Sequence, residues 1–273
     1  MDRILQEYFD LGVMFDPDNF DKVIDGFWFT IRLSIVAGIT SLLFGLLLAV
    51  LRQTPGKWGG LVRGPTIAYI DVFRGVPQLL TILIVSLSLA ALASPNLETG
   101  EDGVLPRWLG IPEWFGLPAP FWYGVIAITL TYGAYFAEVY RAGIEAVPEG
   151  QTEAARSLGM SYAQCMRQVI IPQAVRKVIP PLLNDFIALM KDTTLVSVIG
   201  LIEVVQAGRD IQNLEFNSSA LMLGAILFIL VTIPLARQVD VLIAREQRKT
   251  RRGGSGGGDA PSEPPPTTGM AGA

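Results

Sequence analysis

The sequence contains no histidine, and Cys165 is the only cysteine among its 273 residues. These absences exclude catalysis by histidine, zinc sites built from cysteine and histidine, and an intramolecular disulfide. The sequence also lacks a Gly-x-x-x-x-Gly-Lys-Ser/Thr phosphate loop and a Gly-x-Ser-x-Gly nucleophile elbow. We therefore expect that the chain is not an enzyme and that it holds no cofactor or metal.

The first seven residues lack the basic segment, apolar stretch and small-residue cleavage site of a secretory signal peptide. We expect that no signal peptide is cleaved and that the first long apolar segment directs insertion into a membrane. The net charge of −4 gives no indication of a nucleic-acid partner.

Apolar residues are abundant: 51% of the chain is hydrophobic, and the mean hydropathy is +0.43. A bilayer core about 30 Å thick needs about 20 apolar residues per helical span. Helices are expected because a lipid-exposed backbone must satisfy its own hydrogen bonds. The predicted fold class is an all-α integral membrane protein with about five transmembrane helices. The predicted spans are residues 27–51, 67–93, 121–144, 178–201 and 219–239.

Basic residues are concentrated in alternate connections, which indicates orientation because positively charged loops stay in the cytoplasm. They follow the first, third and fifth spans: Arg52, Lys57 and Arg63; Arg156, Arg167, Arg176 and Lys177; and Arg245, Arg248, Lys249, Arg251 and Arg252. The other segments hold fewer, namely Arg3, Lys22, Arg107 and Arg209. We therefore expect the amino terminus outside and the carboxyl terminus in the cytoplasm.

The composition along the chain divides it into three predicted regions. Residues 1–26 mix acidic and aromatic side chains and are predicted to form an external amphipathic arm, with a poorly ordered lead-in as the equal alternative. Residues 27–245 are predicted to form the transmembrane domain. Residues 246–273, rich in glycine and proline, are predicted to form a disordered cytoplasmic tail.

The connection between the third and fourth spans, about residues 145–177, carries the most specific pattern. Glu153, Ala154 and Ala155 are followed by three residues, Gly159, nine residues, and Val-Ile-Ile-Pro ending at Pro172. This spacing resembles the EAA loop of ATP-binding-cassette (ABC) importer permeases, where the usual ending is Ile-x-Leu-Pro. The resemblance implies that these five named residues couple the chain to a separate ATPase.

Local physical chemistry also favours a helix-turn-helix in this loop. Thr152 is predicted to cap a short helix, the two alanines leave room for another surface, and Gly159 permits a left-handed turn. The alternative is a solvated connector between two spans, which the charges of Glu149 and Arg156 would suit. The complete motif spacing favours the coupling loop.

Three further stretches, residues 70–77, 135–151 and 180–195, resemble the polar amino-acid branch of the same family. The resemblance implies a multi-pass subunit of the cell (inner or plasma) membrane that imports polar amino acids by alternating access. It also implies partners: an ATPase that binds ATP and Mg²⁺, a second permease subunit of the same or paralogous sequence, an extracytoplasmic solute-binding protein, and membrane lipid.

Charges inside the predicted spans need a partner or a watery path, since each costs about 2.5 to 3.5 kcal/mol at a helix centre. Glu138 and Arg141 lie on one helical face, where they could pair or contact a solute. A structural pair is likewise predicted for Asp71 and Arg74, one turn apart.

The fourth span offers the best candidate contacts for an amino acid. Asp192, Thr193 and Thr194 would contact its ammonium and carboxylate groups, whereas a tether between Asp192 and Lys191 is the alternative. The full predicted substrate pathway is Glu138, Arg141, Asn184, Lys191, Asp192, Thr193 and Thr194.

A second hypothesis is an ion-coupled secondary transporter or channel, in which Glu138, Lys191 and Asp192 would form an ion path. The sequence shows no internal inverted repeat, which argues against it. Charges of both signs leave acidic, amidic and cationic amino acids open as substrates.

Overall fold

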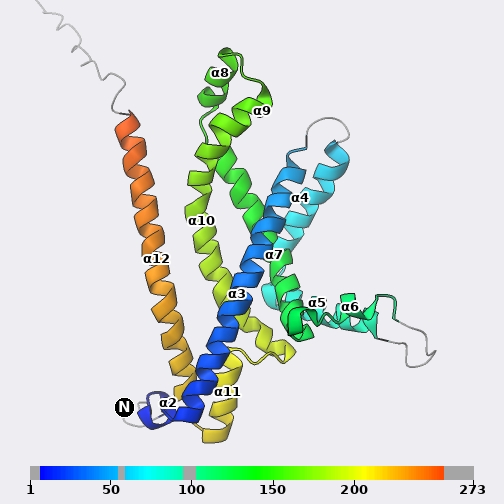
Figure 1. Ribbon diagram of the computed structural model, residues 1–273, viewed down its shortest axis with the longest axis vertical. Helices are drawn as coiled ribbons and strands as arrows, with labels where there is room; N and C mark the ends of the chain where they lie inside the picture. The colour runs from blue at the N-terminus through cyan, green and yellow to red at the C-terminus, as the bar shows by residue number, and fades with distance from the viewer. Residues whose placement is uncertain (1–6, 55–58, 95–102, 255–273) are drawn as a thin grey trace, which may run out of the picture.

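The computed structural model describes residues 7–54, 59–94 and 103–254, with side chains described as far as residue 244. Every regular element within these ranges is a helix. In chain order they are α2 (Leu11–Met14), α3 (Pro17–Arg52), α4 (Gly59–Gly75), α5 (Gln78–Ala93), α6 (Arg107–Gly110), η1 (Trp114–Gly116), α7 (Ala119–Glu145), α8 (Glu149–Ser157), α9 (Tyr162–Cys165), η2 (Met166–Ile170), α10 (Ile171–Asp192), η3 (Thr193–Ile199), α11 (Val204–Glu215) and α12 (Ser219–Gly254). The long helices run lengthwise, whereas α5 lies across them (Figure 1).

The centre of the molecule is the contact between α3 and α7. Their backbones approach closely at Gly45, where an added Cβ would lie 2.8 Å from the carbonyl oxygen of Gly133. The main apolar cluster surrounds this contact and includes Leu33, Ile82, Phe121, Ile128, Phe136, Leu189 and Val196. Helices α3, α5, α7 and α10 therefore share one core.

The second predicted span is wrong as a single helix, because α4 and α5 meet at an angle of 111°. Pro77 lies at the break, with φ −58° and ψ 137°. Proline has no N–H to continue the helical ladder, and it disfavours helical backbone at the residue before it. Because residues 67–93 form one apolar run, the sequence pattern did not predict this break.

The fourth predicted span also differs from the structure. The α-helix ends at Asp192 and continues to Ile199 only as the 3₁₀ segment η3. Gly200 ends this segment in the left-handed conformation at φ 82°. The chain then turns into α11, where the backbone N–H groups of Val205 and Gln206 donate to the carboxylate of Glu203.

By length and composition alone, two described helices could cross a membrane: α3 and the Ser219–Ala244 part of α12. The bent α4–α5 pair would be a third if it counts as one span. Helix α7, which matches the third predicted span, and α10, which overlaps only part of the fourth, are not among them. In α7, buried polar aromatics such as Tyr123 lower the hydropathy, and its hydroxyl donates to the Gly110 carbonyl at 2.9 Å. The number of five spans therefore stays a prediction.

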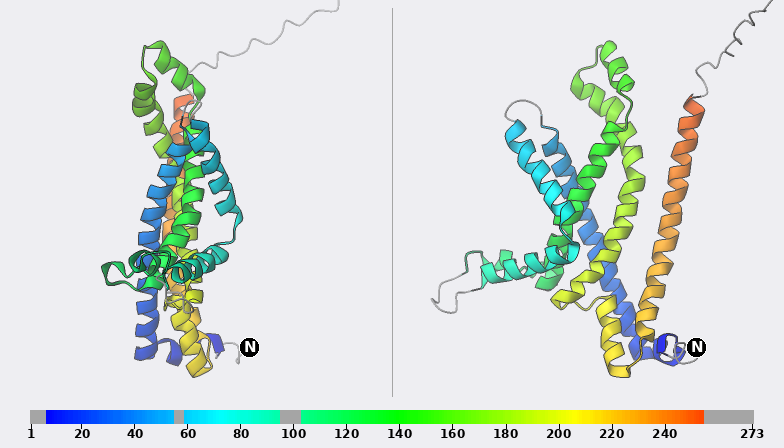
Figure 2. Two further views of the ribbon diagram at one scale, coloured as in Figure 1. Left: turned by 90° about the vertical axis from the view of Figure 1, so that its right-hand side faces the viewer. Right: turned by 180° about the vertical axis from the view of Figure 1, so that it is seen from behind.

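The three segments with many basic residues lie at one end of the bundle. The adjoining ends of α3 and α4, the α8–α9 segment and the carboxyl end of α12 share this end in each view (Figures 1 and 2). Helices α2 and α11 lie at the opposite end. We call the end that holds α8 and α9 the hairpin end, and the opposite end the α11 end.

The boundaries of the predicted terminal regions fall inside helices. Helix α3 begins at Pro17, where the side chain of Asp16 accepts hydrogen bonds from the N–H groups of Asp18 and Asn19. The last ten residues of the predicted arm are therefore part of α3. Helix α12 extends to Gly254, past the predicted start of the tail at residue 246, and residues 255–273 lie outside the described residues.

Candidate functional site

The predicted coupling loop folds as a hairpin of α8 and α9, which continues through η2 into α10. Gly159 ends α8 at φ +80°. Its N–H donates to the Arg156 carbonyl at 3.0 Å, and the Met160 N–H donates to the Ala155 carbonyl at 3.2 Å. This pair of bonds is a Schellman motif, which closes a helix through a left-handed residue. The prediction of a glycine-dependent turn agrees with this geometry.

The start of the hairpin differs from the prediction. Helix α8 begins directly after Pro148, so Thr152 lies inside the helix and does not cap it. The second helix is capped instead: Ser161 and Gln164 form a reciprocal capping box at the start of α9. This arrangement satisfies backbone N–H groups that would otherwise have no partner at an exposed turn.

The two faces of α8 differ in exposure. Ala155 is only 4% exposed and packs in a cluster with Val147, Cys165, Ile170 and Ala174, so it contacts its own chain. Glu153, Ala154 and Gly159 are exposed on the outer side. Leu158 is also there, 84% exposed, and Tyr162 follows it, 64% exposed. Neither Leu158 nor Tyr162 was predicted as a site residue; the available signal was two large apolar residues on either side of the glycine.

Pro172 lies at the junction of the hairpin with α10 and is exposed. Since proline has no N–H, the normal helical bond to residue 168 cannot form. The preceding turn is a π-helix, in which the Ile171 N–H donates to the Met166 carbonyl. Pro172 therefore sets the geometry of the junction and does not lie on the exposed tip of the hairpin.

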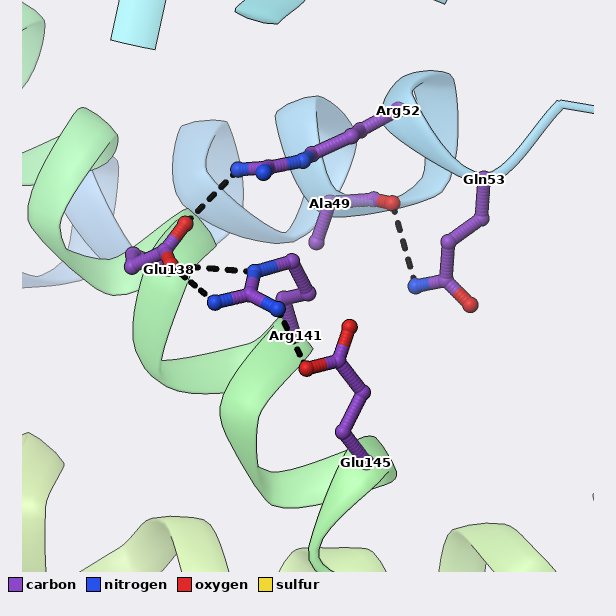
Figure 3. A network of polar contacts seen from close by, with 6 residues as sticks. All are labelled: Ala49, Arg52, Gln53, Glu138, Arg141 and Glu145. Carbon is purple, nitrogen blue, oxygen red and sulfur yellow. Dashed lines mark hydrogen bonds and ion pairs between the residues drawn. The ribbon is translucent and has the colours of Figure 1, made fainter. Parts of the chain in front are cut away.

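Glu138 and Arg141 form the predicted pair, within a larger network near the hairpin end (Figure 3). Arg52 of α3 donates to Glu138 at 2.7 Å. Arg141 donates to Glu138 through Nε at 3.0 Å and also pairs with Glu145. The network joins the ends of α3 and α7.

A cavity of about 440 Å³ lies at the break between α4 and α5. It is lined by Arg74, Gly75, Val76, Pro77, Gln78, Thr131, Tyr132, Tyr135, Asp185, Ala188 and Asp192. The Tyr132 hydroxyl donates to Asp192 at 2.9 Å. We call this space the break cavity. Its volume falls within the range of about 300 to 1,000 Å³ that small-molecule sites occupy.

The break cavity contains polar side chains without partners. Thr131 is only 3% exposed, and its hydroxyl makes no hydrogen bond among the described residues. The same holds for both amide atoms of Gln78. Buried polar groups in folded proteins are nearly always hydrogen-bonded. These unpartnered groups therefore mark the break cavity as a place where a polar ligand would supply the missing bonds.

Arg74 does not form the predicted ion pair with Asp71: none of the ion pairs found in the described part of the chain includes either residue. Its guanidinium lies over the ring of Tyr135, 5.7 Å from the centroid. Arg74 lies in the last turn of α4, next to the break, and lines the break cavity.

The other predicted pathway residues are divided among several places. Asp192 lines the break cavity, whereas Lys191 and Thr194 line a separate, mostly apolar cavity against α11 and α12. Thr193 is fully buried, and its hydroxyl lies 3.2 Å from that of Ser34 in α3. Asn184 is exposed. Of the seven, only Asp192 lies with Arg74, Gln78, Thr131 and Asp185.

The sequence signal for the break cavity was incomplete. Asp185 and Asp192 lie seven residues apart, two helical turns, so both face the same side of α10. This spacing was readable in advance. The contributions of Gln78 and Thr131 depend on the α4–α5 break, which only the structure showed. No group of three or more histidine, cysteine, aspartate or glutamate residues suited to a metal occurs within the described ranges.

Comparison with known proteins gives consistent matches. Residues 26–248 match the family described as binding-protein-dependent transport system inner membrane component. The chain is 33% identical over 235 residues to the probable glutamine ABC transporter permease protein GlnM of Bacillus subtilis (strain 168), covering 85% of this chain and 96% of that protein. It is 31% identical over 221 residues to the arginine transport system permease protein ArtQ of the same strain, covering 77% and 86%.

Solved structures of transporters also match this chain. One described as an amino acid ABC transporter with histidines aligns with a TM-score of 0.68 and 31% identity, covering 83% of this chain and 94% of that chain. An inward-facing structure of the MetNI methionine ABC transporter aligns with a TM-score of 0.61 over 83% and 99%, at 18% identity. At this lower identity the second match concerns the fold alone.

Proposed function

Because the chain belongs to the family of binding-protein-dependent transport system inner membrane components, it is a membrane subunit of such a transport system, and we propose that it imports polar amino acids. The names of its relatives support this solute class: they describe glutamine, arginine and glutamate transport. The energy source is a separate ATPase, which binds ATP and Mg²⁺.

The α8–α9 hairpin is the observation that carries this proposal. It projects from the bundle at the end that also holds the basic ends of α3 and α12 (Figure 1). Since basic segments stay in the cytoplasm, the hairpin end faces the ATPase and the α11 end faces the extracytoplasmic binding protein. The exposed surface of Glu153, Ala154, Leu158 and Gly159 would dock on the ATPase. The amino terminus lies outside in this orientation.

The hairpin is mechanically connected to the helices that line the break cavity. It continues without a loop into α10, which carries Asp185 and Asp192. Gln151 of α8 also bonds to Gln173 of α10 at 3.2 Å. Movement of the hairpin by the ATPase would therefore move one wall of the break cavity, as alternating access requires. A second permease subunit would complete the pathway.

Reconstitution in proteoliposomes tests the proposal. The chain, its ATPase and its binding protein are expected to accumulate a polar amino acid only when ATP is present on the ATPase side. Uptake should persist when ionophores collapse the membrane potential. Uptake that proceeds without ATP and disappears with the membrane potential would contradict the proposal and favour an ion-coupled transporter.

A further inference from the structure

The break cavity has an unequal number of positive and negative side chains. Its lining contains the carboxylates of Asp185 and Asp192 and the guanidinium of Arg74. Among the ion pairs of the described residues, none includes any of these three groups. Lys191, adjacent in sequence to Asp192, lines a different cavity. A ligand in the break cavity would therefore face two negatively charged side chains and one positively charged side chain.

From this lining we infer that the break cavity takes amino acids with a cationic side chain, such as arginine or lysine. The inference rests on the proposed function and specifies its substrate class. Such a ligand carries an ammonium group, a carboxylate and a side-chain cation. These charges match the two carboxylates and one guanidinium in number and in sign.

The positions of the charges also fit a ligand of this kind. At a rise of 1.5 Å per residue, Asp185 and Asp192 lie about 10 Å apart along α10. Ala188, the small residue between them, lines the same wall. Arg74 comes from the end of α4, on another element of the lining. The two carboxylates would bind the two cationic ends of an extended ligand, and Arg74 would bind its carboxylate.

The unpartnered groups complete this assignment. The amide oxygen of Gln78 and the hydroxyl of Thr131 can accept hydrogen bonds from an ammonium or guanidinium group. A neutral amide side chain could use the same groups but would leave one aspartate without a cation. An acidic side chain would place a further carboxylate beside the two aspartates, and such like-charge contacts discriminate strongly against a ligand. The expected order of affinity is cationic, then amidic, then acidic.

Binding measurements on the assembled transporter, without the solute-binding protein, test this order. Radiolabelled L-arginine is bound to the purified complex of permease and ATPase in nanodiscs, and L-lysine, L-glutamine and L-glutamate compete. Lysine should compete best and glutamate least. Tighter binding of glutamate than of arginine would overturn the inference.

The Asp185→Asn variant tests the role of the carboxylate. Loss of a charge-assisted bond should weaken arginine binding about 10-fold to 100-fold, while glutamine binding is retained or improved. Retained glutamine binding shows that the variant is folded. The matched control is Asp210→Asn on α11, an exposed aspartate outside the break cavity, which should leave arginine binding unchanged. Unchanged arginine binding by Asp185→Asn would overturn the inference.

The outcomes separate the inference from the proposed function. If the complete system performs ATP-driven uptake of glutamine or glutamate but neither binds nor transports arginine or lysine, the inference is wrong and the proposed function holds. If no amino acid is taken up with ATP, the proposed function itself is wrong.

Discussion

Leu158 offers the sharpest test of where the ATPase binds. Its side chain is 84% exposed beside Gly159, at the tip of the hairpin. Burial of a leucine side chain stabilises a contact by about 1.5 to 3 kcal/mol. If the ATPase covers Leu158, the Leu158→Ala variant should lose about 1 to 2 kcal/mol of binding free energy. That loss corresponds to ATPase binding weakened about 5-fold to 30-fold.

The assay is the dissociation constant between the purified permease in nanodiscs and its ATPase, measured by surface binding. The thermal stability of the permease should not change, since an exposed side chain contributes little to folding. Leu214→Ala is the matched control, because Leu214 is 70% exposed on α11 at the opposite end. If Leu158→Ala binds the ATPase as tightly as the unaltered chain does, or if Leu214→Ala weakens binding equally, the ATPase does not cover Leu158.

Three further pairs of variants test the fold and the network around the site. Gly159→Val should strain the left-handed turn by at least about 1 to 2 kcal/mol. It should therefore reduce uptake more than Gly159→Asn does, since asparagine tolerates this conformation. Equal uptake by both variants would contradict the need for a left-handed residue at this position. Gly45→Ala should lower the melting temperature, because the added methyl overpacks the contact at a cost of about 1 to 3 kcal/mol. Gly64→Ala should not, because no atom lies within 4 Å of its added Cβ. Similar melting temperatures for the two variants would contradict the close contact of α3 and α7. Glu138 is 22% exposed, and Glu138→Gln should destabilise the fold by about 1 to 3 kcal/mol. Glu145 is 60% exposed, and Glu145→Gln should destabilise it by under about 0.5 kcal/mol. Denaturant or thermal unfolding measures both effects, and the reverse order would contradict the network.

Local turn chemistry explains why the hairpin was predictable. A glycine that ends a helix is read from neighbouring residues, and both the Gly159 turn and the helix-turn-helix agree with the structure. Thr152 was misassigned because Pro148, four residues earlier, already starts the helix. Both Pro148 and Thr152 are residue types that often stand at the start of a helix, and α8 begins directly after the earlier one.

The break cavity was not predictable by the same means. Hydropathy treats residues 67–93 as one apolar run, although Pro77 divides it at 111°. That break brings Gln78 of α5 beside Thr131 of α7 and Asp185 of α10. Contacts between three helices distant in sequence depend on tertiary packing, which residue patterns within each helix do not contain. The same reason applies to Thr193, whose partner Ser34 is 159 residues away.

We propose that the hairpin couples ATP hydrolysis in the ATPase to solute movement at the break cavity. The most direct measurement is the number of amino acid molecules imported per ATP hydrolysed in proteoliposomes that contain the complete system, for the unaltered chain and for Gly159→Val. We expect that the variant, with its ATPase still bound, hydrolyses ATP while importing far fewer molecules per ATP. An unchanged ratio at normal rates of uptake would contradict the account.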